Sequence, residues 1–369
     1  SAVTRRGEVV VEGHQVGHVA GFGFSPDPLA VGDEKKLVWR AARRALREEM
    51  PRRVAQAEAA ADSAFGWTDG RDAAGADAGG PDTTGCDTPE HDIPAHHLTW
   101  DGVAIARLRP GSSALNPRVE VLDSEFLDGA QRERLRIRLQ AYVDARLRAD
   151  LAPLFAMMAH AEALREARGP VHLLREGLGV VPEAGVDAFT PALRAQLKQI
   201  GVRAGRFALF VPALLKPRPT AMRARLWALH RGVAAPELPA PGLVSVPLPA
   251  EWPPGFAAMA GWVEAGPVLL RLDVAERVAG ELAWATQRGA TVLPTGLAGR
   301  FSVKAELVPA VLRGLGFRVL PGGSLGPGGF GPPTPPMLAP LKRRRAVPSE
   351  LPDEPHPRGP FAALAALKR

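Results

Sequence analysis

Alternating apolar and polar residues predict a β-hairpin near the start of the chain and a second hairpin 89 residues later. The first covers residues 9–19, with β-branched residues on both sides of a Glu12-Gly13 turn. The second covers residues 98–108, with Asp101-Gly102 at the equivalent turn. Because the turns and the apolar positions of the two segments coincide, we expect them to fold in the same way.

An amphipathic helix is predicted after each hairpin. The first helix begins at about Asp33, and Pro51 is expected to end or kink it because proline lacks an amide donor. The second helix runs from about Asp128 to Ala152, and apolar residues recur along it at helical spacing. These residues are Leu135, Leu139, Tyr142, Val143, Leu147 and Leu151. We therefore expect a duplicated hairpin-plus-helix unit, with copies at 1–61 and 98–168.

The segment between the two copies is predicted to be a flexible insert, at 62–97. Residues 69–97 are rich in Gly, Asp, Ala and Pro and contain almost no large apolar residues.

A basic helical domain is predicted at 169–236. A helical region from Leu154 to about Leu178 leads into it and stops at Gly179. Two capped helices follow, one from Thr190 to Gly201 and one from Thr220 to Gly232. Between them, the apolar run 207–211 is either a buried strand or an apolar loop. Trp227 lies on the last of these helices, and its type favours a place in the core over a role in stacking on bases.

The rest of the chain is predicted to hold one more small domain. A Pro-rich linker at 237–255 precedes a helical domain at 256–320, where Ser302 is expected to cap the second of two short helices. That pair of helices is compatible with a helix-turn-helix or winged-helix module. The Gly/Pro-rich segment 321–369 is predicted to be a disordered basic tail. The predicted fold class is thus α+β and mainly α-helical.

Charge is distributed unevenly along the chain, whose net charge is +7. Residues 1–187 hold 23 basic and 29 acidic residues, whereas residues 188–369 hold 23 basic and 10 acidic ones. The stretch from Ala188 to Pro236 has no Asp or Glu, yet it contains nine basic residues. A segment without carboxylates keeps a positive potential, which is typical of proteins that bind polyanions.

The sequence contains none of the constellations that carry catalysis. No Gly-rich loop ending in Lys and Ser/Thr is present to hold nucleotide phosphates, so the chain is not expected to hydrolyse ATP by itself. The run Gly322–Gly326 matches a nucleophile elbow only formally, because it lies in a Gly/Pro-rich tail. Histidines at 14, 18, 91, 96 and 97 lack the paired spacing of a zinc site, so surface histidines are the favoured interpretation.

Cysteine usage and hydropathy favour a cytoplasmic location without a membrane partner. The single Cys86 excludes an intrachain disulfide, and the longest apolar run, 207–215, is too short to span a bilayer. Because the chain opens on Ser1 rather than Met, we expect it to be part of a longer polypeptide or a trimmed chain.

The segment GVRAGRFALFVPALLKP at 201–217 resembles a run found in bacterial superfamily-two DNA/RNA helicases that are similar to the mitochondrial RNA-degradosome helicase. The runs DSEFL at 123–127, LDVAER at 272–277 and LGFR at 315–318 resemble the region that follows the motor in that family, as does the Pro-rich basic tail. The resemblance covers nearly the whole chain, but its motifs are apolar and structural.

The resemblance implies a specific role. The family couples ATP hydrolysis in two RecA-like domains to unwinding, and its C-terminal part would bind or guide the strand. This chain lacks every motor motif, so ATP and Mg are implied only for a parent helicase, and no catalytic residue or cofactor is carried over to this chain.

We therefore expect a non-catalytic accessory region that binds single-stranded RNA or DNA without sequence specificity, with a RecA-like motor in the same polypeptide as a further partner. The residues predicted to contact phosphates are Arg203, Arg206, Lys216, Arg218, Arg223, Arg225, Arg231, Lys342, Arg343, Arg344 and Arg345. The alternative is a protein-interaction scaffold that docks through the apolar segments 207–215 and 361–367.

Overall fold

The computed structural model describes residues 2–3, 8–11, 14–26, 33–68, 96–184, 186–323, 326–327 and 330–341. This described part contains ten α-helices and five small antiparallel sheets. The fold is therefore mixed α+β, and the prediction of a mainly α-helical chain is wrong. Most of the missed strands have only two to four residues, too few for an alternating pattern to be visible in the sequence.

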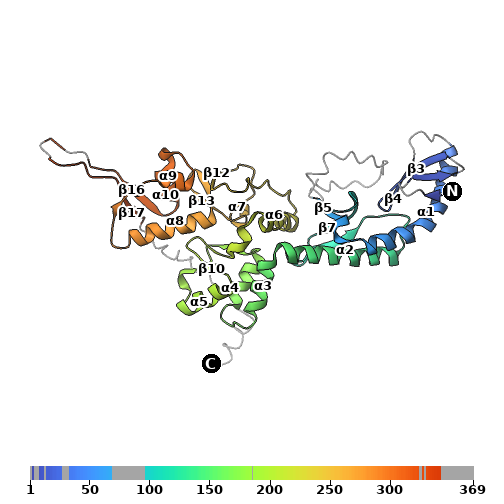
Figure 1. The fold of residues 1–369 in the computed structure, drawn as a ribbon, viewed down its shortest axis with the longest axis horizontal. Coiled ribbons are helices and arrows are strands. Elements are labelled where there is room, and N and C mark those ends of the chain that lie inside the picture. The colour runs from blue at the N-terminus through green and yellow to red at the C-terminus, as the bar shows by residue number, and fades with distance from the viewer. Residues whose placement is uncertain are drawn as a thin grey trace, which may run out of the picture.

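Two similar units begin the chain and form one end of an elongated molecule (Figure 1). The first consists of β1 (Ala2–Val3), β2 (Glu8–Val11), β3 (His14–Ala20), β4 (Gly23–Pro26) and α1 (Asp33–Ala59). The second consists of the 3₁₀ helix η1 (Asp62–Ala64), β5 (Phe65–Thr68), β6 (His97–Trp100), β7 (Val103–Arg109), β8 (Arg118–Val121) and α2 (Gly129–Asp150). In each unit the strands pair in sequence order.

The predicted pair of equivalent hairpins is confirmed by the strand register. Val9 pairs with Gly17 in the first unit, and Leu98 pairs with Ala106 in the second. The register then shifts directly after Val9 and directly after Leu98, so a bulge occupies the same position in both copies. A slip of one residue would turn every side chain to the opposite face. The shared register and bulge therefore show that one structural unit occurs twice.

Two predictions about this region need correction. Helix α1 begins at Asp33 as predicted, but it continues past Pro51 to Ala59. Apolar side chains on both sides of the proline are fully buried, which favours a continuous helix despite the lost amide donor. Residues 62–68 of the predicted insert are ordered as η1 and β5, because β5 pairs with β6. The remainder of that insert, up to residue 95, lies outside the described residues.

Helix α2 matches its prediction closely. Asp128 is the N-cap, and it forms a reciprocal capping box with Gln131. The predicted apolar stripe is buried.

The central region contains four helices and a three-stranded sheet. Its elements are α3 (Ala152–Ala161), α4 (Arg168–Glu176), β9 (Val180–Pro182), η3 (Val186–Ala188), α5 (Pro191–Gln199), β10 (Arg203–Ala204), β11 (Ala208–Phe210), η4 (Pro212–Leu215) and α6 (Pro217–Arg231). Thr190 caps α5 as predicted, and Gly232 ends α6 in the left-handed conformation. Thr220 does not cap α6, because the helix begins at Pro217, where proline is well tolerated.

The last region combines two more sheets with short helices. Its elements are β12 (Ser245–Pro247), α7 (Phe256–Met259), β13 (Trp262–Ala265), β14 (Val268–Arg271), α8 (Leu272–Ala285), β15 (Thr291–Val292), α9 (Leu297–Phe301), η5 (Ala305–Leu307), α10 (Val308–Gly314), β16 (Phe317–Leu320) and β17 (Met337–Pro340). From α8 onward, helix, strand, two helices and two strands follow one another, and the sheet order is β15-β17-β16. This is the order of elements in winged helix-turn-helix modules.

Three predictions about the last region are wrong. The linker at 237–255 contains β12, which pairs with β14. Ser302 is the C-cap of α9 and does not cap α10. The tail predicted from residue 321 still contains β17, whose partners are β15 and β16. Residues 342–369 of that tail lie outside the described residues.

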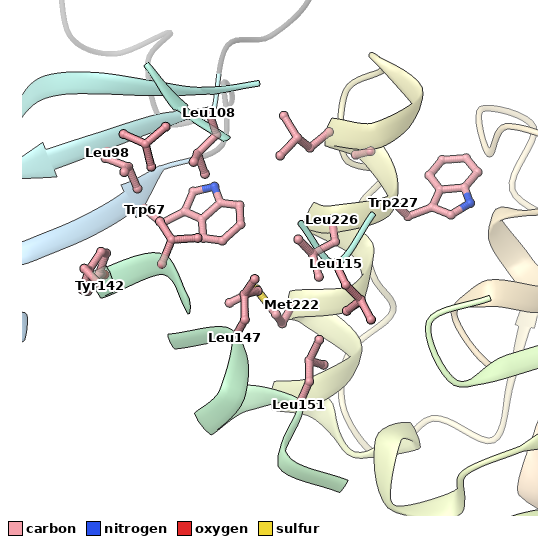
Figure 2. Packing of buried hydrophobic residues seen from close by; sticks show 14 of the residues in the cluster. Trp67, Leu98, Leu108, Leu115, Tyr142, Leu147, Leu151, Met222, Leu226 and Trp227 are labelled. Atoms are coloured by element: carbon pink, nitrogen blue, oxygen red, sulfur yellow. The ribbon is translucent and has the colours of Figure 1, made fainter. Parts of the chain in front are cut away.

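One apolar core joins the second unit to the central region. Figure 2 shows Leu147 of α2 and Leu151, which follows that helix, near Met222 and Leu226 of α6, while Leu115 lies beside α6. This core fixes the position of α6, on which several of the predicted cations lie. Within the described residues, no helix combines the length and the apolar character that crossing a bilayer requires.

Candidate nucleic-acid interface

The structure does not bring the predicted cations of residues 188–236 together on one surface. Arg223 is fully buried, and Arg225 is half-buried. The other five are exposed but belong to different elements. These are Arg203 on β10, Arg206 before β11, Lys216 and Arg218 at the start of α6, and Arg231 at its end. The basic residues at 342–345 lie outside the described residues.

Arg223 has a structural role. Its guanidinium donates to the carbonyl of Leu178 at 2.6 Å, to that of Leu214 at 3.3 Å and to that of Met259. Leu214 and Met259 lie in the last turns of η4 and α7, and Leu178 follows α4. Carbonyls at the ends of helices lack intrahelical donors and carry partial negative charge. Two such carbonyls, together with that of Leu178, therefore compensate the buried cation in place of a carboxylate.

Burial lowers the pKa of Arg223 to about 9, because desolvation disfavours the charged form. The guanidinium nevertheless carries its charge at neutral pH. Since it has no exposed surface, it does not reach a phosphate in this structure.

Arg218 is paired with the N-terminal half of the chain. Its Nε lies 2.5 Å from Oδ1 of Asp150, and Nε of Arg146 lies 2.7 Å from the other carboxylate oxygen. The side chain of Asp150 is only 2% exposed, although both guanidinium groups are partly solvated. This carboxylate links the end of α2 to the start of α6, so Arg218 is engaged in a contact between elements.

Arg231 lies over an aromatic ring. Its guanidinium carbon is 5.0 Å from the ring centroid of Trp227, a distance typical of cation–π contacts. Trp227 is buried, as its residue type led us to expect, and it packs against Phe256.

Arg206 lies where the central region meets the last region. Glu276 of α8 accepts hydrogen bonds from three successive backbone amides, those of Arg206, Phe207 and Ala208. Gly205 is required here, since a Cβ at that position would lie 2.2 Å from the carboxylate. The contact joins two of the runs that carry the helicase resemblance, at 201–217 and at 272–277.

The side chain of Arg206 extends from that junction to β16. Its guanidinium carbon is 5.2 Å from the ring centroid of Phe317, and it lies against Gly316, where a Cβ would be 2.7 Å from Nη2. Arg313 at the end of α10 and Arg318 on β16 flank this turn, and both are exposed. Neither makes an ion pair with another residue that the structure describes.

The chain also returns to this turn at the end of the described part. The amide of Leu341 donates to the carbonyl of Gly316 at 2.9 Å, and the basic run 342–345 follows directly in sequence. We call the surface formed by Arg206, Arg313 and Arg318 the Gly316 turn surface. Arg206 was predicted from the sequence, but Arg313 and Arg318 were not. An acid-free stretch is defined by consecutive residues, whereas these two arginines are brought near Arg206 by the fold.

Arg206 also borders a hollow of about 610 Å³. This hollow is lined by Glu183, Asp187 and Glu264 together with apolar residues such as Trp262. Carboxylates repel phosphate groups, so an anionic strand would lie on the Gly316 turn surface and not in this hollow.

The histidines do not form a metal site in the described part of the chain. Contrary to the expectation of surface histidines, His96 is buried, and its Nδ1 accepts a hydrogen bond from Trp67 at 3.3 Å. His91 and Cys86 lie outside the described residues. In the part of the chain with described coordinates, no three His, Cys, Asp or Glu side chains are grouped closely enough to hold a metal ion.

Comparison of the chain with protein-family models, curated proteins and solved structures found no match. The resemblance to helicases is therefore still a prediction.

Proposed function

We propose that this chain is a non-catalytic module that binds single-stranded RNA or DNA without sequence specificity. The observation that carries the proposal is the contact of the Arg206 guanidinium with the turn at Gly316, which the exposed Arg313 and Arg318 flank in sequence and to which Leu341 returns just before the basic run at 342–345. Exposed guanidinium groups at one site neutralise successive phosphates and release their counterions. A place beside an ATP-driven motor, in the cytoplasm, is part of the proposal and rests on the resemblance in sequence.

The winged-helix order of elements also supports contact with nucleic acid, by analogy of fold. A single strand suits this molecule better than a duplex groove. Helix α10 has only seven residues, and the hairpin of β13 and β14 covers one side of it. At that contact a Cβ on Gly314 would lie 2.5 Å from the backbone nitrogen of Gly266. The helix is therefore poorly placed to enter a major groove.

The alternative, a protein-interaction scaffold, is weakened because one of its two predicted docking segments is mostly buried. Ala208, Leu209, Phe210, Val211 and Leu214 are all buried, so most of the apolar run 207–215 belongs to the core. The other segment, 361–367, lies outside the described residues.

A titration of affinity against salt tests the proposal. Fluorescence anisotropy of a labelled oligouridylate would be measured over a range of salt concentrations for the wild type and for Arg313→Gln/Arg318→Gln. Each phosphate contact on a single strand contributes about 0.7 to the slope of log affinity against log salt. The double variant should therefore bind more weakly, with a slope shallower by about 1.4.

The matched control is Arg44→Gln/Arg47→Gln, which removes two exposed arginines from α1 at the far end of the molecule (Figure 1). This variant has the same net charge as the first and should bind like the wild type. Affinity that barely changes with salt, or an equal loss in both double variants, would contradict the Gly316 turn surface as the binding site.

A further inference from the structure

Trp284, on the last turn of α8, is a large aromatic side chain exposed on a helix of the last region. It is 77% exposed, whereas the tryptophans at 67, 227 and 262 are all buried. Tryptophan is highly buried on average in folded proteins, so a side chain this exposed requires an explanation.

The geometry of α8 determines what surrounds Trp284. Leu272, Ala275, Val278, Ala279 and Leu282 are buried and form the core face of the helix. Arg277 precedes Trp284 by seven residues, a spacing that places both on the same face of α8, and Arg288 lies in the turn that follows the end of the helix at Ala285. Both arginines are exposed, so the solvent side of α8 carries an indole and a guanidinium group, and a second guanidinium group lies just beyond the helix.

A third guanidinium group lies on the same side. Glu281 is three residues before Trp284, and its carboxylate lies 2.7 Å from Nη2 of Arg300 on α9. This ion pair neutralises the one carboxylate beside Trp284 on that face. The exposed ring thus shares its helix face with the cation of Arg277, and the carboxylate three residues before it is already compensated.

We propose that Trp284 is a platform on which a base of single-stranded nucleic acid stacks, with Arg277, Arg288 and Arg300 contacting the adjoining phosphates. The inference rests on the proposed function and assigns it a second contact, separate from the Gly316 turn surface. Every base presents a π-face, so stacking on an indole adds affinity without selecting a sequence. Excess positive charge around the ring favours an anionic strand over an apolar protein partner.

The test separates stacking from phosphate binding. Affinities of the wild type, Trp284→Ala and Trp284→Phe would be measured by fluorescence anisotropy for a labelled oligothymidylate and for an abasic oligomer of equal length and charge. Trp284→Ala should weaken binding to the oligothymidylate about tenfold, and Trp284→Phe should retain most of the affinity. For the abasic oligomer all three proteins should bind alike, because it has no base to stack.

Ile137→Ala serves as the control, since it also removes an exposed apolar side chain, on α2. It should leave both affinities unchanged. One outcome would be that the wild type shows clear salt dependence and that Trp284→Ala binds the oligothymidylate as tightly as the wild type. The stacking platform would then be wrong while the proposed function stands, and Trp284 would be a candidate contact for a protein. If the wild type binds neither oligomer at low salt, the proposed function itself fails.

Discussion

The arginines of the two repeated units and those of the acid-free stretch are compensated in different ways. In the repeated units guanidinium groups meet carboxylates across the fold, as in the pairs Arg43–Glu125 and Arg134–Glu58. In the stretch 188–236 one arginine, Arg218, also pairs with a carboxylate, that of Asp150. The other contacts differ, since Arg223 donates to backbone carbonyls, and Arg206 and Arg231 lie over aromatic rings. A segment without acids can therefore still hold its cations by means of helix ends and π-systems, and only some of its positive charge is left at the surface.

The largest effect is expected at Arg223. Arg223→Met would remove the guanidinium donor of two buried carbonyls, those of Leu178 and Met259, while the carbonyl of Leu214 would keep its hydrogen bond from the Thr220 hydroxyl. Each unsatisfied group costs about 1–3 kcal/mol, so the free energy of unfolding should fall by about 2 kcal/mol or more, as measured by urea denaturation. Arg223→Lys should be intermediate, since an ammonium lacks the planar fork that reaches three carbonyls.

Arg203→Met is the matched control for this change. Arg203 is an exposed arginine of the same stretch, so its replacement should alter stability by no more than about 0.5 kcal/mol. Equal stabilities for the two methionine variants would show that the carbonyl network contributes nothing, and the contrast between the two regions would lose its main support.

Arg223 also illustrates what the sequence could not reveal. Its place in an acid-free, basic run made it a candidate for phosphate contact, and nothing in the sequence distinguishes it from the exposed Arg203. The surroundings of Arg223 depend on three segments that converge on one point of α6, and two of them, at Leu178 and Met259, are distant in sequence. Such convergence is a property of tertiary packing, which a pattern of residue types does not encode.

The sequence predicted structure more reliably where an element is stabilised by contacts between residues that are close in sequence. The two hairpins, the capping box of α2 and the cap of α5 were all predictable, because turn residues, caps and alternation act over a few positions. The strands β9, β10, β12 and β17 were missed, since each is short and is stabilised by partners that fold around it. The Gly316 turn surface was missed for a related reason, because Arg206 reaches the turn through tertiary contacts with Phe317 and Gly316, residues that are distant in sequence.

A smaller effect is expected at Asp150, the carboxylate that links the two regions. Asp150→Asn removes the charge that Arg146 and Arg218 share, and hydrogen bonds between charged groups contribute about 1.5–3 kcal/mol. We expect a loss near the lower end of that range, because both guanidinium groups are partly exposed and can rehydrate. Urea denaturation would measure the change.

Asp123→Asn is the appropriate comparison for Asp150. Asp123 also pairs with an arginine, but its side chain is 93% exposed, so solvent screens the pair and no measurable change is expected. A double-mutant cycle with Arg218→Gln should show coupling at Asp150 and none at Asp123. Absence of coupling at Asp150 would mean that α2 and α6 are held together by their apolar contacts alone.

The smallest effect is expected at Glu120, a residue of the second unit whose contribution to stability should depend on pH and which has no counterpart in the first unit. Hydrogen bonds from Arg109 and Arg107 lower the pKa of Glu120 below its ordinary value. A carboxyl whose pKa is lowered on folding adds stability above its ordinary pKa of about 4.3, and this stability is lost as the pH falls through the lowered value. The pair that corresponds to Arg107 and Glu120 in the first unit is His18 and Ser25, which has no carboxylate.

Glu120→Gln should therefore reduce the free energy of unfolding at neutral pH by about 0.2–0.5 kcal/mol, a small value because the side chain is 44% exposed and screened by solvent. The difference from the wild type should vanish in acid, once the carboxyl is protonated. Glu306→Gln, which alters an exposed carboxyl without an ion pair among the described residues, is the control and should leave the free energy of unfolding at neutral pH unchanged within error. Because carbonyls and aromatic rings do not titrate in acid, the effect of Arg223→Met on the free energy of unfolding should persist over the same pH range. If the effects of Glu120→Gln and Arg223→Met both vanished in acid, the two kinds of compensation would not differ.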